Sequence, residues 1–217
     1  MRTVRGPGVH ELLIQRSRFR CALSPAASTE QATAFIDAVR RDHWSATHNC
    51  TAFRIGPHGE QQRSSDDGEP AGTAGVPMLQ VLVHREVTDT VAVVTRYFGG
   101  VKLGTGGLVR AYGRCVAEAL DAVGLLDLVP HTAVAVTVGP AAAGRLEHDL
   151  RSAGLALTGT DYAGAETTFR ILVPTDHLAG FTGWLAQVSA GAATAVPGSA
   201  VLRAVPPAGR SAGRSAG

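Results

Sequence analysis

Hydrophobic and polar positions in the first 125 residues follow two spacings, an alternation typical of strands and a 3.6-residue period typical of helices. The alternation predicts strands at residues 9–15, 18–23, 51–55, 78–84 and 91–97. The helical period predicts one helix from Ser28, with Gln31 at the capping-box spacing, and another from Leu108 to a stop at Gly124. Residues 61–75 are polar and rich in glycine, so they predict a loop.

The pattern restarts after residue 130. It predicts a strand at 132–138, a helix from Pro140 to Gly154, strands at 155–162 and 166–173, a helix from Pro174 to about Val188, and a strand at 193–204 interrupted at Pro197-Gly198. The order β-α-β-β-α-β is that of a ferredoxin-like fold, a four-stranded sheet with two helices on one face. We therefore predict an α+β protein of two domains, residues 1–125 and 130–205, with a disordered tail at 206–217.

Composition and charge add limited information. An apolar content of 45% supports a packed core, and a net charge of +2 neither favours nor excludes nucleic acid. The three cysteines, Cys21, Cys50 and Cys115, are odd in number and widely spaced, which argues for reduced thiols in a cytoplasm. The sequence has no apolar run typical of a signal peptide or a transmembrane helix, so we expect a cytoplasmic protein without membrane contact.

Residues 93–114 combine the densest glycine in the chain with its only lysine, Lys102. Residues 104–107 predict a tight turn into the following helix, where unpaired backbone N–H groups favour a phosphate or a carboxylate. The residues predicted for this anion or nucleic-acid site are Arg96, Gly99, Gly100, Lys102, Gly104, Thr105, Gly106, Gly107, Arg110 and Arg114. Alternatively, the glycines allow close packing and positive φ. No dinucleotide or Walker motif is present in the stretch, and no cofactor is predicted.

A second cluster, SSDDGEP at residues 64–70, places three carboxylates within four residues: Asp66, Asp67 and Glu69. Such a loop can hold a hard cation, cap the backbone of a turn, or fold near the basic glycine turn and screen it. His48 is a further possible ligand of this loop, and the metal, if one is bound, is unknown. His48 and Cys50 have two interpretations. They are either a nucleophile pair, which needs an orienting third group, or a semi-buried histidine beside a buried cysteine.

Three segments in this order resemble the YigZ/IMPACT family: HNCTAFRIG (48–56), SSDDGEPAGTAGVPML (64–79) and VVTRYFGGVKLGTGGLVRAYG (93–113). The signature resemblance covers roughly residues 16–122, and the chain from about 130 to 205 resembles the second domain of bacterial members. The resemblance implies a first domain similar to the second domain of a small-subunit ribosomal protein and to domain IV of elongation factor G. The second domain would be ferredoxin-like, similar to a C-terminal domain of the same factor.

The resemblance carries no established catalytic residues, and it implies RNA or the ribosome as partners. Eukaryotic relatives modulate translational control through a partner of a starvation-sensing kinase. We therefore predict a non-enzymatic protein that binds nucleic acid or the ribosome and acts in translation or its stress regulation. Two alternatives stay open. One is an enzyme for a small phosphorylated or carboxylated substrate, with a compact pocket between the glycine turn and the carboxylate loop. The other is a protein-interaction adaptor without nucleic-acid contact.

Overall fold

The computed structural model describes residues 1–207, which form two compact units. The first unit comprises Met1–Leu128 together with the chain from Ala204, and the second is Val129–Arg203. The predicted disordered tail lies outside the described residues from position 208 onward. Among the helices described, none is both long enough and apolar enough to cross a membrane.

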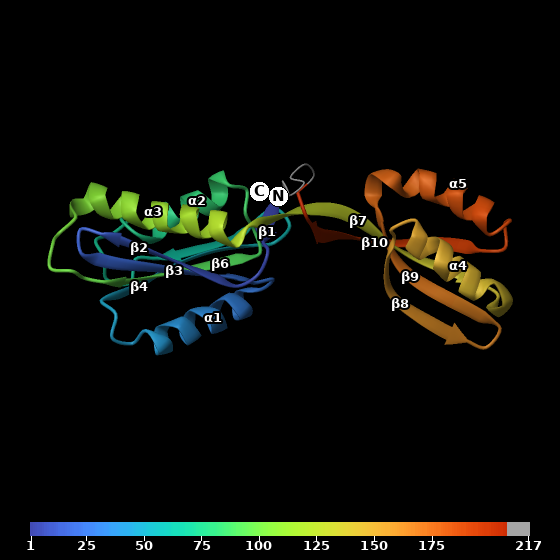
Figure 1. Cartoon of the computed structure of the whole chain (residues 1–217), viewed down its shortest axis with the longest axis horizontal. Helices are drawn as coiled ribbons and strands as arrows, with labels where there is room; N and C mark the ends of the chain where they lie inside the picture. The colour runs from blue at the N-terminus through green and yellow to red at the C-terminus, as the bar shows by residue number, and fades with distance from the viewer. Residues whose placement is uncertain (208–217) are drawn as a thin grey trace, which may run out of the picture. The chain divides into compact units, whose positions relative to one another are not determined.

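A five-stranded antiparallel sheet in the order β2-β3-β6-β4-β5 forms the centre of the first unit (Figure 1). Its strands, in chain order, are β2 (Gly8–Ile14), β3 (Ser17–Pro25), β4 (His48–Ile55), β5 (Gln61–Ser65) and β6 (Thr90–Tyr97). Helices α2 (Gly75–His84) and α3 (Gly104–Val123) cover one face, and α1 (Thr29–Asp42) lies on the other face against β4 and β6. The sheet therefore has a hydrophobic core on each side.

Helix α1 begins as the capping-box spacing predicts. The Ser28 side chain accepts a hydrogen bond from the backbone N–H of Gln31 at 3.3 Å. The Gln31 side chain in turn accepts from the backbone N–H of Ala27 at 2.9 Å, which satisfies a second free donor before the helix. Ile36 and Val39 then pack against the sheet.

Helix α3 starts four residues earlier than predicted. The expected tight turn at 104–107 is wrong, because these residues form the first helical turn. A helix does not need intrahelical partners for its first N–H groups, so glycine is tolerated there. Gly104, at φ 70°, lets the chain enter the helix from an irregular segment, and Gly124, at φ 81°, ends it as predicted.

Two predictions for residues 61–84 are also wrong. Residues 61–65 form β5 at the edge of the sheet, and the predicted strand at 78–84 belongs to helix α2. The buried positions Gly75, Met78 and Leu82 are three and four residues apart, which is the spacing of a helix. Pro77 lies in the first turn, where a missing N–H leaves no intrahelical bond unmade.

The second unit has the predicted ferredoxin-like order of elements. These are β7 (Leu125–Val138), α4 (Pro140–Ser152), β8 (Ala156–Ala163), β9 (Glu166–Pro174), a 3₁₀ turn (Thr175–His177), α5 (Leu178–Val188) and β10 (Thr194–Val205). The strands pair in the order β10-β7-β9-β8, and both helices pack on one face of them. Strand β10 runs through Pro197-Gly198 without the predicted interruption. A short strand, β1 (Arg2–Val4), pairs with residues 125–127 at the start of β7.

The close packing of α2 on β5 gives a stability prediction. A Cβ added at Gly75 would lie 2.7 Å from the backbone nitrogen of Ser65, so we expect Gly75→Ala to lower the free energy of unfolding by about 1–3 kcal/mol. The matched control is Gly113→Ala in α3, where the new Cβ would meet Val81 at an ordinary 3.8 Å. This control should be neutral or stabilising by up to about 1 kcal/mol. Urea unfolding followed by circular dichroism measures both, and equal midpoints for the two variants would contradict the prediction.

Candidate functional site

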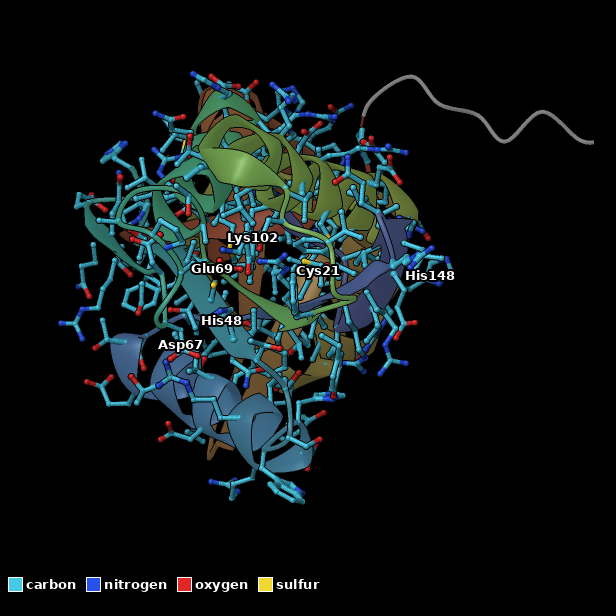
Figure 2. All side chains as sticks on the ribbon, turned by 90° about the vertical axis from the view of Figure 1, so that its left-hand side faces the viewer. Cys21, His48, Asp67, Glu69, Lys102 and His148 are labelled. Atoms are coloured by element: carbon cyan, nitrogen blue, oxygen red, sulfur yellow. The ribbon has the colours of Figure 1, made fainter. Side chains whose placement is uncertain are left out.

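A pocket of about 410 Å³ opens in the first unit between the start of α3, the end of β6 and the loop after β5. It brings together the three segments that the sequence analysis singled out. His48 comes from β4, Glu69 from the carboxylate loop, and Lys102 from the segment before α3. Figure 2 labels these three side chains, which lie near one another in that view. The carboxylate loop thus lies beside the glycine-rich entry to α3 rather than far from it.

A buried ion pair forms the back of the pocket. Glu69 Oε1 accepts a hydrogen bond from Arg96 Nη1 at 2.6 Å and another from the Tyr112 hydroxyl at 2.8 Å. Arg96 Nη2 also donates to the Ser17 hydroxyl at 3.3 Å, whereas Arg96 Nε has no partner among the described residues. Glu69 therefore neutralises Arg96 inside the protein, as expected if the loop screens the basic stretch.

Aromatic rings hold this pair in position. The Arg96 guanidinium lies over the rings of both Phe19 and Phe98, at 5.3 and 5.5 Å from their centroids. The Tyr112 ring on α3 packs edge-on against Phe19. Burial, followed by neighbouring Cys50 and Glu69, raises the pKa of the Tyr112 hydroxyl far above its ordinary value. The hydroxyl is therefore protonated and acts as the donor to Glu69.

The other two carboxylates of the loop bind backbone and side chains of the protein itself. The Asp66 carboxylate accepts from the N–H groups of Gly72, Ala74 and Gly75 at 2.8–3.0 Å, and so caps the start of α2. Asp67 accepts from Arg40 at 3.0 Å and from the backbone N–H of Asn49 at 2.7 Å. Neither lines the pocket. In the part of the chain that the structure describes, no group of three His, Cys, Asp or Glu could hold a metal ion.

The loop also orients His48. Its Nδ1 lies 2.8 Å from the backbone carbonyl of Asp67. A carbonyl oxygen only accepts, so Nδ1 carries the proton and Nε2 carries the lone pair when the ring is neutral. Nε2 is directed toward Glu69 Oε2, 3.9 Å away, and the side chain is 19% exposed in the pocket wall. His48 is therefore held in one tautomer at a position that a ligand can reach.

Cys50 does not act with His48 as a nucleophile. It points to the same side of β4 but is fully buried, and its thiol donates to the Asp66 carbonyl oxygen at 3.0 Å. Burial raises the pKa of the Cys50 thiol to about 12. Because the thiolate is the reactive form, the thiol is inert at neutral pH. The alternative of a buried cysteine beside a semi-buried histidine describes this pair.

The positive end of the pocket is formed by Lys102 and the first turn of α3. No side chain caps this turn, and it contains no acidic residue. Gly104 and Thr105 line the pocket, so their backbone lies beside the cavity. Lys102 is exposed and forms no ion pair within residues 1–207. The site therefore combines a cation with the dipole-positive start of a 20-residue helix.

Four other residues predicted for the anion site do not line the pocket. Arg110 is exposed on α3 with no ion pair to a described residue, whereas Arg114 pairs with Glu118 at 2.6 Å. Gly99 serves packing, because a Cβ there would lie 2.0 Å from the Arg16 carbonyl oxygen. Gly100 has a positive φ of 85°. For these two glycines the packing and conformational alternative applies.

Sequence reasoning missed the pocket residues that carry no charge. Phe98, Leu103 and Leu108 form its apolar wall, and Thr47 holds the backbone N–H of Phe98 through its hydroxyl at 3.1 Å. Phe98 is the one with a usable signal, since an aromatic residue directly before Gly-Gly at a strand end is unusual for a turn.

Comparisons with known proteins cover most of the chain. Residues 15–120 match the family model described as the Impact N-terminal domain, and residues 136–192 match a domain of unknown function, DUF1949. The chain is 42% identical to the IMPACT family member YvyE of Bacillus subtilis, over 87% of each chain. It is 39% identical to the IMPACT family member YigZ of Escherichia coli, over 82% of this chain and 88% of that protein. A crystal structure of a hypothetical protein, 36% identical, matches it with a TM-score of 0.63 over 91% of this chain and 97% of that one.

The cap that Asp66 provides gives a pH prediction. Burial opposes ionisation of Asp66, but the N–H groups of Gly72, Gly75 and Ala74 outweigh it and hold the pKa below its ordinary value. A lowered pKa stabilises the fold above the unfolded-state value of about 3.9, and this contribution is lost as the pH falls through the folded-state pKa. We expect Asp66→Asn to cost about 1–3 kcal/mol at pH 7 and progressively less in acid.

Urea unfolding at pH 7, 5 and 3 measures this effect. The control is Asp37→Asn on α1, whose exposed carboxylate makes no hydrogen bond or ion pair to a described residue. A constant difference between Asp66→Asn and the wild type across these pH values would show that the cap does not depend on the charge.

Proposed function

We propose that this chain, which belongs to the IMPACT family, binds a small ligand through a phosphate or carboxylate group in the pocket beside α3. One observation carries the proposal. The single carboxylate that lines the pocket, Glu69, is already neutralised by Arg96, while Lys102 and the start of α3 have no partner among the described residues. The uncompensated charge of the pocket is therefore positive.

The first turn of α3 suits an anion for a physical reason. Its free N–H groups and the helix dipole both favour negative charge, and Gly104 in the pocket wall has no side chain that covers the backbone. Lys102 adds a full charge next to them. Phe98, Leu103 and Leu108 offer an apolar wall for the carbon skeleton of the ligand. A small organic phosphate or carboxylate can place its anionic group at the start of α3 and its carbon skeleton against the apolar wall.

The shape of the site favours a small ligand over a polynucleotide. A grip on a nucleic-acid backbone needs several accessible cations along an open groove. Here Arg96 is buried and neutralised, and Arg114 is paired with Glu118. The carboxylate loop and the start of α3 instead enclose a compact pocket, which is the arrangement expected for a small phosphorylated or carboxylated compound. His48, whose Nε2 lies in the pocket wall 3.9 Å from Glu69 Oε2, is then the side chain placed to exchange a proton with such a ligand.

Titration of the labelled protein with inorganic phosphate and with phenyl phosphate tests the proposal. We expect amide shifts in NMR spectra at residues 104–107, and a dissociation constant at least about tenfold higher for Lys102→Ala, since each tenfold loss equals about 1.4 kcal/mol. Phenyl phosphate should bind more tightly than phosphate, because its ring can contact Phe98. Arg41→Ala, an exposed arginine in the last turn of α1, is the charge-matched control and should bind like the wild type. Shifts elsewhere, or no loss in Lys102→Ala, would refute a site at α3.

A second candidate function is nucleic-acid or ribosome binding with a role in translation or its stress regulation. The observation in its favour is that Lys102 and Arg110 are both exposed and form no ion pair to a described residue. Two phosphate contacts predict a shallow salt dependence, with a slope of log K against log salt of about −1.4 to −1.8. Binding of RNA and of ribosomal subunits across a salt series, with the double variant Lys102→Ala/Arg110→Ala in parallel, measures it. No binding at low salt, or an unchanged slope in the variant, would count against it.

A protein partner is the candidate for the second unit. Residues 129–203 carry four basic and five acidic side chains, so this unit has no excess of positive charge for phosphate contacts.

A further inference from the structure

Two hydrogen-bond acceptors lie side by side in the pocket without a donor from the protein. Glu69 Oε1 accepts from Arg96 and from Tyr112, but Glu69 Oε2 receives no hydrogen bond from a described residue. His48 Nδ1 carries the ring proton, so Nε2 presents a lone pair when the ring is neutral. His48 Nε2 and Glu69 Oε2 are 3.9 Å apart, which is too far for a hydrogen bond between them. This acceptor pair is therefore left for a group from outside the chain.

The free oxygen of Glu69 is in contact with the cavity. The Glu69 side chain is only 3% exposed, and it lines the pocket together with His48. Within residues 1–207, the fully buried side-chain nitrogen and oxygen atoms that lack a hydrogen bond are Arg54 Nε and Arg96 Nε. Glu69 Oε2 is not one of them, so it retains accessible surface toward the pocket. A carboxylate oxygen so deeply placed is costly unless a donor reaches it, which favours a ligand that supplies one.

The charge around the acceptor pair favours a neutral donor. Glu69 already neutralises the Arg96 guanidinium, at 2.6 Å, and Lys102 adds a second cation to the same pocket. A ligand ammonium group at Glu69 Oε2 would add a third positive charge, and like charges repel more strongly in a partly desolvated site than in water. Hydroxyl groups donate without a charge. One hydroxyl has a single hydrogen and satisfies one acceptor, whereas two hydroxyls on neighbouring carbons can satisfy both.

We propose that the ligand of this pocket is a small phosphate or carboxylate with two hydroxyl groups on neighbouring carbons, which donate to His48 Nε2 and Glu69 Oε2. The inference rests on the proposed function, because the anionic group is placed at Lys102 and the start of α3. The acceptor pair adds selection by hydroxyl groups to selection by charge. A site built to bind hydroxyl groups rejects a ligand without them, because its buried polar atoms are then left unpaired.

Calorimetric titration of the whole chain with matched ligands tests the inference. The first pair is 2,3-dihydroxypropyl phosphate and propyl phosphate, which differ only in the two hydroxyl groups. We expect the dihydroxy compound to bind at least about tenfold more tightly, a difference equal to about 1.4 kcal/mol. The second pair, 3,4-dihydroxybutanoate and butanoate, repeats the comparison for a carboxylate. A preference in either pair supports the inference, and equal affinities within both pairs would refute it. The titrations are done at pH 8, above the ordinary range of imidazole ionisation.

The variant His48→Ala tests the acceptor pair itself. We expect the ratio of the affinities for the two phosphates to fall at least about threefold, because one of the two acceptors is lost. A general disturbance of the pocket would weaken both ligands and leave the ratio as it is in the wild type. The matched control is His84→Ala, an exposed histidine at the end of α2 outside the pocket, which should keep the wild-type ratio. Glu69 is not substituted, because its loss leaves Arg96 buried without a counter-charge.

The outcomes separate this inference from the proposed function. Lys102→Ala should weaken propyl phosphate and 2,3-dihydroxypropyl phosphate alike, since both carry the anionic group. Binding that depends on Lys102 but shows no preference for hydroxyl groups would leave the proposed function standing and overturn the inference. Tighter binding of 3-aminopropyl phosphate than of 2,3-dihydroxypropyl phosphate would identify a cation as the donor, and would also overturn it. Absence of binding by every compound would overturn both.

Discussion

The buried pair of Glu69 and Arg96 is the interaction on which the rest of the first unit depends. Two charges withdrawn from water are stable only when each is satisfied, and removal of one partner leaves the other costly to bury. Here the carboxylate belongs to a loop, the guanidinium to β6, and the hydroxyl that completes the arrangement to Tyr112 on α3. The pair therefore determines where the loop lies relative to the helix, and the pocket is the space that this placement leaves.

The other carboxylates of the same loop have supporting roles. Asp66 binds the start of α2, and Asp67 links the loop to α1 and β4. Their combined effect is that the Asp67 carbonyl is fixed and His48 has one tautomer. Of the three carboxylates in this loop, only Glu69 lines the pocket, and Glu69 is paired with Arg96. This explains how an acidic segment can border a site whose net character is positive.

The sequence predicted secondary structure correctly where the hydrophobic positions follow a clear helical or strand period. It failed where the residue types favour a different element from the one that forms. The alternation in β6 and the whole order of the second unit were predicted correctly. Residues 78–84 were mistaken for a strand because their valines and leucines favour β structure, although Pro77 marked a helix start. For the site, His48, Glu69 and Lys102 stood out by residue type. Their proximity was one of several alternatives from the sequence, since the partner of Arg96 lies 27 residues away and is selected only by the folded packing. Tyr112 falls on the apolar stripe of α3, so nothing in the sequence separates it from the core.

The chain contains a single lysine, and that lysine stands at the mouth of the pocket. Acylation of a lysine side chain in this protein can therefore occur at one position, where it would remove the charge beside α3. An amine-reactive reporter would likewise attach there, apart from the free amino group at the start of the chain. Because the other basic side chains are arginines, an amine-directed reagent distinguishes this site from the rest of the surface.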